Sequence, residues 1–417
     1  MNKHYIIIIM VSAMIFSKVD AQTFDVVSIG QGYGGQAFYS MQNGEIANVP
    51  NDNWDLAFQI GGFQASIRVN GKNDVRLFRA GLPASDWNSL SPFDTVNVLN
   101  STNELYNSDT SWWYGAFNMG YDTANVFDLG WGVYDFATHI VTGDSLYFLI
   151  TPSGIVKKVW IESLANGVYT FRHADVDGAN EVTATLDKAN FQGKNFGYYS
   201  IASNSTLDRE PPKQDWDLVF NQYMAVTPIT YKVTGVLSND SVFTAKAYPV
   251  EYSNADPWAQ PLTGHINNIG YEWKNFDLNT FSWVIADSTV YFVQDRSGQI
   301  WKMMFTGFGG SSTGDYEFVK DPVSLTSIEQ PEVPQILSMY PNPANSLVRM
   351  VVAAQHSGTS EIRVQYISGK TALQRTIGSS SGLQEVSLDI SNLRSGMYIV
   401  SVQGDAGISF QKLQVVR

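Results

Sequence analysis

Apolar and polar residues alternate along much of this chain, and a period of two is typical of β-strands with one buried face. The pattern is clear at 24–29, 65–70 and 74–79, and it returns at 144–150 and 155–161. Asn-Gly pairs, which favour tight hairpin turns, lie between some of these runs. The alternation therefore predicts an all-β chain made of antiparallel strands.

One sequence block occurs twice and shows how the strands are organised. Segment 53–58 (NWDLAF) is matched by 215–220 (DWDLVF), with the two tryptophans 162 positions apart (216 − 54). A Tyr-Ser pair precedes each copy, at 39–40 and at 199–200. With the two later blocks described next, four blocks recur in the same order at similar offsets, which is hard to obtain by chance, so we predict a duplication.

Two later blocks extend the repeat. Segment 144–154 (DSLYFLITPSG) corresponds to 287–298 (DSTVYFVQDRSG), and YTF at 169–171 corresponds to YEF at 316–318. We therefore predict two tandem antiparallel β-rich modules. The first covers residues 22–187 with its linker, and the second covers residues 188–325.

The repeat makes specific structural expectations. Trp54 should superpose on Trp216 and Gly154 on Gly298, with both indole rings in a core. The aspartates that follow the tryptophans, Asp55 and Asp217, are expected to face solvent or to cap a turn.

The composition changes after the second module. Residues 326–337 contain two prolines and predict an extended linker. Residues 338–417 show several short alternating strands and a tight Gly turn, which predict a small separate β-sandwich. The predicted fold class is thus all-β, with two tandem modules and a C-terminal β-sandwich.

Composition and charge exclude some classes of function. The chain of 417 residues has 44% hydrophobic residues, a formal net charge of −13 and no cysteine. The negative charge disfavours nucleic-acid binding. Without cysteine, no disulfide, thiolate metal site or cysteine nucleophile can form.

The N-terminus predicts export. Lys3 precedes an apolar run at 5–16, and small residues lead to a cleavage site between Ala21 and Gln22. This is the pattern of a signal peptide over residues 1–21, which the Sec translocon would recognise. We expect no membrane span in the mature chain, because no other apolar stretch is long enough.

Two motifs permit a functional reading and a simpler structural one. The glycines at 30, 32 and 35 fit a dinucleotide-binding spacing, but a strand-like segment follows where a helix would be needed. The carboxylates and glycine of 175–181 lack the full calcium-loop spacing. We predict a turn at each place.

Catalytic motifs are not found in the sequence. There is no H-E-x-x-H, G-x-S-x-G or P-loop pattern, and no pair of carboxylates can be chosen for glycosidase chemistry. We therefore expect that the protein is not an enzyme.

The C-terminal 80 residues carry motifs of a known family. They include Tyr340-Pro341-Asn342-Pro343, the turn at Gly369-Lys370, the segment 388–398 with Gly396, and the closing KLQVVR. This domain resembles the type A sorting domain of the type IX secretion system. The resemblance implies passage through the type IX secretion machinery of a diderm bacterium and removal by a surface sortase. The cargo would be secreted or displayed on the exterior of the outer membrane.

The two modules resemble the HmuY family of β-rich haem-binding surface proteins. The residues that carry the likeness are the Tyr-Ser and Trp-Asp blocks, Ile67-Arg-Val-Asn70, and the strands bearing Lys158 and Lys302. The resemblance implies capture of haem or another small hydrophobic ligand. A structural or adhesive surface protein that keeps the scaffold without a haem site is the alternative.

Haem would need axial ligands. The first candidates are His139 and His173, which lie near the Trp-rich segment 80–135, a source of apolar wall residues. Both imidazoles would have to reach one iron. His265, His356, Met119, Met224, Met303 and Met304 remain further candidates, and a surface His or a core Met is the simpler interpretation of each.

Overall fold

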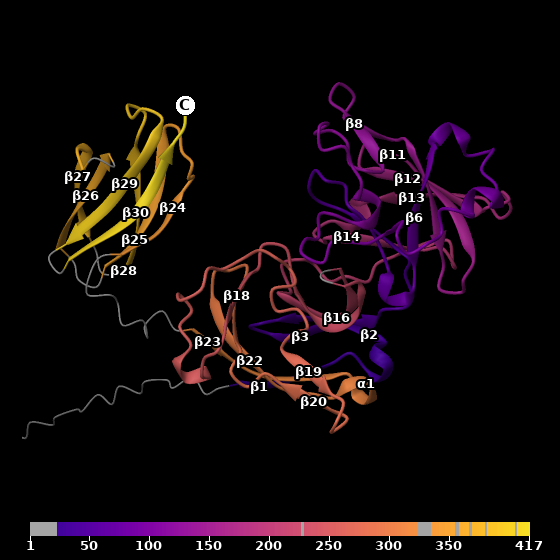
Figure 1. The fold of residues 1–417 in the computed structure, drawn as a ribbon, viewed down its shortest axis with the longest axis horizontal. Coiled ribbons are helices and arrows are strands. Elements are labelled where there is room, and N and C mark those ends of the chain that lie inside the picture. Colours follow the sequence, from indigo (N-terminus) through magenta and orange to yellow (C-terminus); the bar gives the residue numbers. More distant parts are fainter. Residues whose placement is uncertain are drawn as a thin grey trace, which may run out of the picture. The chain divides into compact units, whose positions relative to one another are not determined.

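The computed structural model describes residues 23–226, 229–323, 335–354, 358–366, 369–379, 382–404 and 407–417. These residues form antiparallel sheets, which confirms the predicted all-β class. The chain divides into two compact units, Met1–Val323 and Ser324–Arg417, and Figure 1 draws both.

Two sheets of the first unit make up what we call module one. The first has the strand order β15 (Ser205–Leu207), β14 (Phe196–Ser200), β4 (Leu56–Gln59), β5 (Ile67–Val69). The second has the order β13 (Val182–Asp187), β12 (Val168–Asp175), β11 (Val156–Ala165), β10 (Ser145–Ile150), β6 (Arg76–Pro83), β7 (Glu104–Leu105). Hairpin β8 (Gly132–Asp135) and β9 (Ile140–Gly143) joins this second sheet, because β9 pairs with β11.

Two further sheets make up module two. One has the order β17 (Tyr231–Ser238), β16 (Leu218–Ala225), β2 (Gly35–Ser40), β3 (Gly44–Pro50). The other has the order β1 (Thr23–Ser28), β23 (Asp315–Pro322), β22 (Ile300–Phe308), β21 (Val290–Gln294), β18 (Phe243–Ala247). Strands β19 (Lys274–Asp277) and β20 (Ser282–Ile285) form a separate hairpin, and α1 (Gly310–Thr313) is a single short helix turn.

Short 3₁₀ segments connect these strands. They lie at Gln31–Tyr33, Gly71–Asn73, Ala84–Asp86, Pro92–Thr95, Ala116–Asn118, Lys188–Phe191 and Tyr252–Asn254. The first of them contains the glycine-rich motif, which is therefore a turn between β1 and β2, as predicted. No long helix follows it in the described part of the chain, so helix-terminal phosphate binding has no structural basis here.

The two modules have the same strand order, but each takes one hairpin from the other copy of the repeat. The Tyr-Ser hairpin β2–β3 of the first copy pairs with β16, the Trp-Asp block of the second copy. Conversely, the hairpin β14–β15 of the second copy pairs with β4 of the first. Module one is thus continuous in sequence, whereas module two is completed by the N-terminal strands (Figure 1).

The predicted boundary between residues 187 and 188 therefore does not coincide with a boundary between sheets. Strand β13 ends at Asp187, but β14 and β15 still belong to module one. Strands β1–β3 likewise belong to module two although they start the described chain. The physical reason is that a strand can pair with a partner that is distant in sequence. Because the hairpins β2–β3 and β14–β15 are similar, each is compatible with either Trp-Asp strand, β4 or β16.

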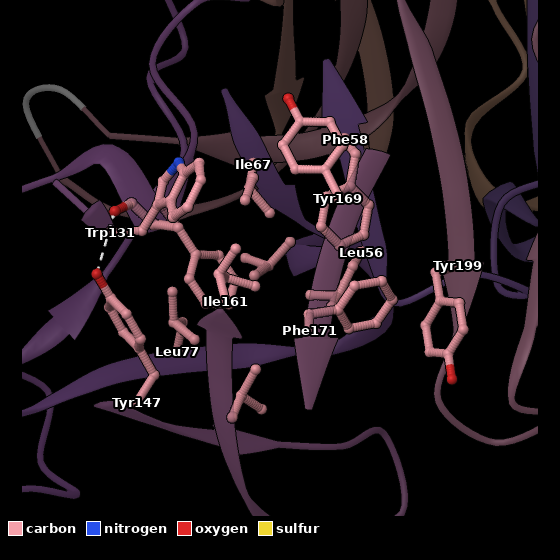
Figure 2. Close-up of a cluster of buried hydrophobic side chains, with 14 of the residues drawn as sticks. Leu56, Phe58, Ile67, Leu77, Trp131, Tyr147, Ile161, Tyr169, Phe171 and Tyr199 are labelled. Carbon is pink, nitrogen blue, oxygen red and sulfur yellow. Dashed lines mark hydrogen bonds between the residues drawn. The ribbon is translucent and has the colours of Figure 1, made fainter. Parts of the chain in front are cut away.

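Separate hydrophobic cores fill the two modules. In module one, the aromatic rings of the core pack at tilted angles, and the centre of the Phe58 ring lies 5.0 Å from that of Tyr169 and 4.8 Å from that of Phe171. Figure 2 shows this core, with Tyr199 of the exchanged hairpin at its edge. In module two the equivalent Phe220 packs against Tyr316 and Phe318. The repeated aromatic residues are therefore the matching core of each module.

The repeated aspartates hold the exchanged hairpins. Asp55 Oδ2 accepts a hydrogen bond of 2.7 Å from the amide of Ile201, and Asp217 Oδ2 accepts one of 2.7 Å from Met41. Both carboxylates are buried. Burial raises the pKa of Asp55, and these amide hydrogen bonds oppose the rise. The expectation of a turn cap is confirmed, and the expectation of solvent exposure is wrong, because the turn that they cap is itself covered.

The equivalence expected from the repeat holds for the two glycines and only partly for the two tryptophans. Gly154 and Gly298 both lie in hairpin turns with positive φ (82° and 90°), a backbone conformation that favours glycine. Trp216 is buried, but Trp54 is only half-buried. Trp54 packs edge-to-face on Tyr198 instead of inside a core, so the prediction of two buried indoles is correct for the second copy alone.

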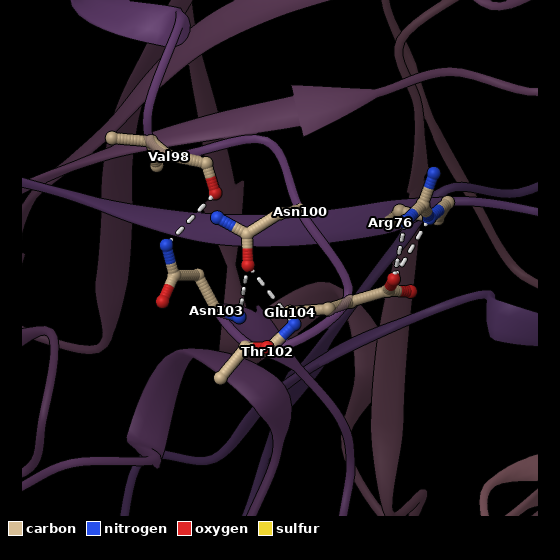
Figure 3. A network of polar contacts seen from close by, with 6 residues as sticks. All are labelled: Arg76, Val98, Asn100, Thr102, Asn103 and Glu104. Carbon is tan, nitrogen blue, oxygen red and sulfur yellow. Dashed lines mark hydrogen bonds and ion pairs between the residues drawn. The ribbon is translucent and has the colours of Figure 1, made fainter.

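The loop between β6 and β7 is held by its own polar contacts (Figure 3). The side-chain oxygen of Asn100 accepts hydrogen bonds from the amides of Thr102 and Asn103, which closes a turn. Arg76 on β6 then donates two hydrogen bonds to Glu104 at the start of β7. Apolar packing also holds this segment, because Trp87 and Leu90 of the loop are buried in a cluster that includes Phe78 of β6.

The second unit is a β-sandwich, as predicted. Over its described residues, one sheet has the order β24 (Gln335–Tyr340), β25 (Leu347–Ala354), β28 (Gly382–Asp389). The other has the order β27 (Thr371–Ser379), β26 (Gly358–Tyr366), β29 (Gly396–Gly404), β30 (Gly407–Val415). One apolar cluster lies between the sheets, with Val348, Ile362 and Val400 fully buried.

The residues singled out in this unit have structural roles. The Asn342 amide group donates to the carbonyl of Lys412 and accepts from the amide of Gln414, so the Tyr-Pro-Asn-Pro segment is attached to β30. Gly369 has φ of 82° in the β26–β27 turn, next to Lys370. Gly396 opens β29 and pairs with Val415. Ala21, Gln22 and His356 lie outside the described residues.

Candidate functional site

His139 lies at the tip of the β8–β9 hairpin, exposed to solvent. Its backbone has φ of 59°, which is unusual for a residue with a side chain. Its Nδ1 atom forms a hydrogen bond of 2.6 Å with the hydroxyl of Tyr134, and its ring lies 6.1 Å from that of Phe136.

His173 occupies a very different place, on β12 inside module one. It is 2% exposed, and its Nε2 atom lies 3.1 Å from the hydroxyl of Tyr199 on the exchanged hairpin. Burial lowers the pKa of His173 to about 4, and the positive charge of Lys157 adds to the effect. The imidazole is therefore neutral at physiological pH and serves as a polar contact between β12 and β14.

The structure does not bring the two histidines together. His139 lies two residues beyond Val141, which is level with Leu164 of β11. His173 is level with Val159 of the same strand. A rise of about 3.3 Å per residue separates the two positions by about 20 Å along the sheet. Two imidazoles that share one iron need nitrogens within about 4 Å of each other. The predicted pairing of His139 with His173 on one iron is thus wrong in this fold.

Comparison with module two explains both histidine positions. Tyr169 and Phe171 of β12 correspond to Tyr316 and Phe318 of β23, so His173 corresponds to Lys320. Lys320 is 5% exposed, and its ammonium group donates to the carbonyl of Met41 at 2.6 Å and contacts Asp25 at 3.1 Å. Each module therefore places a different polar group beneath its exchanged hairpin.

The position of His139 belongs to a further repeat, which the predicted duplication did not include. Trp131-Gly-Val-Tyr-Asp-Phe-Ala-Thr-His139 corresponds to Trp273-Lys-Asn-Phe-Asp-Leu-Asn-Thr-Phe281, at a constant offset of 142 (273 − 131). The signal is the spacing of Trp, aromatic, Asp and Thr. We call these two segments, with their second strands, the tip hairpins.

The two tip hairpins have the same internal construction. A buried indole anchors each base, Trp131 through a hydrogen bond to the carbonyl of Ala65 and Trp273 through one to the carbonyl of Gly270. An aspartate closes each turn by accepting hydrogen bonds from the residues two and three positions later, Asp135 in module one and Asp277 in module two.

Apolar side chains stand exposed at both tips. Phe136 and Leu278 occupy one equivalent position and are each 74% exposed. His139 and Phe281 occupy the other, with φ of 59° and 50°, and Phe281 is 78% exposed. Exposed apolar side chains such as these do not stabilise the fold, because they are not removed from water. The left-handed backbone at His139 and Phe281 is a second indication, because strained backbone is often retained at functional sites. Each tip is therefore a candidate contact surface.

A second candidate is a cavity between the two modules, with a volume of about 70 Å³. Its wall combines rings of Trp54, Trp112 and Tyr198 with polar groups of Arg68 and Asn221. The modules are tied together beside it, because the indole of Trp112 donates to the carbonyl of Ser238 at 2.8 Å. Its volume is far below the 300–1,000 Å³ of drug-sized ligand sites.

Other candidate ligands have ordinary structural environments. Met303 is fully buried in the core of module two, and Met224 packs closely over Gly71. The carboxylate of Asp175, in the acidic segment considered for calcium, pairs with Lys157 at 2.6 Å and accepts from Asn180. Within the described residues, no group of three or more His, Asp or Glu side chains is arranged to hold a metal ion.

Comparison with known families identifies the C-terminal unit. Residues 338–416 match the family described as a secretion system C-terminal sorting domain. The chain therefore carries a type IX secretion signal, and it is a secreted or cell-surface protein. No curated protein matches the chain. Across the described residues, no helix has the length and apolar character needed to cross a membrane.

Proposed function

We propose that the chain is an exported surface protein of adhesive type, which contacts its partner through the two tip hairpins. The observation that carries the proposal is the duplication of an exposed apolar side chain at one equivalent tip position, Phe136 in module one and Leu278 in module two. The second equivalent position carries a ring on a left-handed backbone in both modules, His139 and Phe281. An exposed apolar group that recurs in both copies favours a contact surface over an isolated surface residue.

The arrangement of the tips supports a bridging role. In Figure 1 the hairpin with β8 lies at the end of module one away from module two, and β19–β20 lies at the far side of module two. Two similar contact points on one compact unit can hold two partners, or two places on one repeating surface, and so raise the overall avidity.

Substitution of the tips tests this proposal. One variant carries Phe136→Ser and His139→Ser, a second carries Leu278→Ser and Phe281→Ser, and a third combines them. The measurements are binding of the labelled full chain to the producing cells and agglutination of those cells by chain-coated beads. We expect either two-residue variant to abolish agglutination, which needs both tips, and the combined variant to abolish binding as well.

A matched control separates tip contacts from general surface stickiness. Phe93 is 87% exposed, lies outside both tip hairpins, and can be changed by Phe93→Ser. That variant should bind and agglutinate as the parent does. Equal activity of the parent and the combined tip variant would refute the adhesive proposal.

The resemblance of the modules to the HmuY family supplies a rival proposal, capture of haem or another hydrophobic ligand. Titration of the purified chain with haem distinguishes the two functions. We expect no Soret shift, because the two candidate histidines lie far apart along the sheet. A Soret shift that is lost in His139→Ala or in His173→Ala would favour haem capture instead.

A further inference from the structure

Two residues that line the cavity between the modules carry polar atoms that have no hydrogen-bond partner within the described residues. Asn221 lies on β16, lines the cavity and is 5% exposed, and its Oδ1 atom makes no hydrogen bond. The hydroxyl of Tyr223, two residues further along the same face of the strand, is buried and also unpaired. Buried polar atoms without partners cost about 1–3 kcal/mol each.

These two groups offer opposite hydrogen-bonding functions. An amide oxygen can only accept, whereas a phenol can donate. Burial raises the pKa of Tyr223 far above its usual range, so the phenol keeps its proton at all physiological pH values. A hydroxyl group suits either residue, because it can donate to the amide oxygen of Asn221 or accept from the phenol of Tyr223.

The opposite wall supplies rings and a positive charge. Arg68 is 8% exposed, and its guanidinium group donates to the carbonyls of Ser108 and Ser111 while it lies 5.0 Å from the centre of the Trp112 ring. Burial lowers the pKa of Arg68 to about 10, so it stays charged at neutral pH. Its hydrogen bonds to carbonyls fix it as part of the wall.

We propose that this cavity binds the hydroxyl-bearing edge of a sugar. Flat rings suit the C–H faces of a sugar, and the unpaired acceptor and donor suit its hydroxyl groups. The volume of about 70 Å³ admits a hydroxymethyl group or one ring edge, while the rest of the sugar remains at the half-buried rim near Lys72 and Gln222. This site is separate from the tip hairpins and does not depend on the adhesive proposal.

Titration of the intact chain with glucose, galactose, mannose and N-acetylglucosamine tests the site. Calorimetry gives the affinity, and tryptophan fluorescence reports on Trp54 and Trp112 in the cavity wall. We expect saturable binding of at least one sugar. Tyr223→Phe removes only the hydroxyl, and Asn221→Leu removes the amide at similar volume. Each should weaken binding about 3- to 10-fold, the loss of one hydrogen bond.

Thermal unfolding of the same variants shows whether they remain folded. Tyr223→Phe should keep or raise the melting temperature, because it removes an unpaired buried hydroxyl. The combined tip variant should bind the sugar as the parent does. Absence of saturable binding for all four sugars would overturn the proposal, as would binding that neither Tyr223→Phe nor Asn221→Leu changes.

Discussion

Module one and module two share a strand order, but they place different polar groups at the equivalent buried position beneath the exchanged hairpin. Beneath its exchanged hairpin, module one places neutral His173 against Tyr199. Module two places Lys320 between Met41 and Asp25, and the hydroxyl of Tyr39 donates to the same carboxylate. Both modules therefore keep a polar contact at this position, whereas the type of polar residue differs between them.

A second difference lies at the base of the tip hairpins. Gly132 of module one corresponds to Lys274 of module two. Lys274 is buried, and its ammonium lies 4.1 Å from the centre of the Trp273 ring and 4.5 Å from that of Phe308. Its Nζ atom donates to the carbonyl of Thr234 at 2.5 Å. Module two therefore has a lysine enclosed by aromatic rings at a position where module one has a glycine, which has no side chain. We call Lys274 the caged lysine.

The largest effects are expected when the indole anchors are removed. Trp131→Ala and Trp273→Ala should each lower the free energy of unfolding by about 3–5 kcal/mol, because a large buried ring leaves a cavity. The loss should be greater for Trp273, which stacks on Phe305 at 3.8 Å and also covers Lys274. Urea unfolding followed by circular dichroism measures both.

The exposed Trp258 provides the control for this comparison. It is 45% exposed, and Trp258→Ala should change stability by less than about 0.5 kcal/mol. A loss below about 1 kcal/mol for either anchor would contradict its proposed role.

Removal of the two hairpin-capping carboxylates should have similar effects in both modules. Asp55→Ala and Asp217→Ala each leave a buried amide without its acceptor, at a cost of about 1–3 kcal/mol. Asp55→Asn and Asp217→Asn keep an acceptor and should recover most of this loss. Chemical denaturation measures all four variants. A cost confined to one module would show that the two exchanged hairpins are held in different ways.

The caged lysine should give module two a pH dependence that module one lacks. Burial lowers the pKa of Lys274 from 10.5 to about 7. Folding therefore releases a proton between these values, and stability should rise as the pH increases above 7. The slope cannot exceed about 1.4 kcal/mol per pH unit, and the surrounding rings, which favour the ammonium form, reduce it.

Unfolding free energies measured between pH 7 and pH 9.5 test this slope. Lys274→Met removes the titrating group at similar length, and it should flatten the curve. An unchanged slope in the variant would assign the pH dependence to another group.

The smallest effects are expected at the tips. His139→Gly and Phe281→Gly relieve a left-handed backbone but add freedom to the unfolded chain, so stability should change by less than about 1 kcal/mol. The preceding residues, Thr138 and Thr280, provide the comparison, because glycine there relieves no left-handed backbone. Thr280→Gly also removes the hydroxyl that donates to Asp277, so it should be the less stable of these two. Thermal melts of the four variants measure the difference, and a clear loss in His139→Gly would mean that its ring has a structural role.

The duplication could be predicted from the sequence because buried aromatic residues recur at matching positions. Phe58 and Phe220, or Tyr169 and Tyr316, are fixed by core packing and so retain their type. The exchange of hairpins could not be predicted in this way. Because the two copies are similar, the sequence of the hairpin with Tyr39 does not indicate which of the two Trp-Asp strands it pairs with. Only the folded structure shows that pairing.

The candidate sites were harder to predict for a different reason. His139 is a residue type that can bind haem iron, yet its counterpart Phe281 is not a ligand type. What the two positions share is an exposed ring on a left-handed backbone. Tip residues are not constrained by a core, so their identities differ and the repeat is hard to see. The cavity with Asn221 and Tyr223 depends on the packing of two modules, which no local pattern encodes.

The exchange of hairpins also determines the order in which the chain can fold. All strands of module one lie between Leu56 and Leu207, so it can form as soon as that stretch is available. By contrast, Thr23 of β1 pairs with Lys320, nearly 300 positions later (320 − 23 = 297). Such distant contacts form slowly. Until they form, β1–β3 expose unpaired strand edges, and a chain in transit needs those edges shielded from other chains.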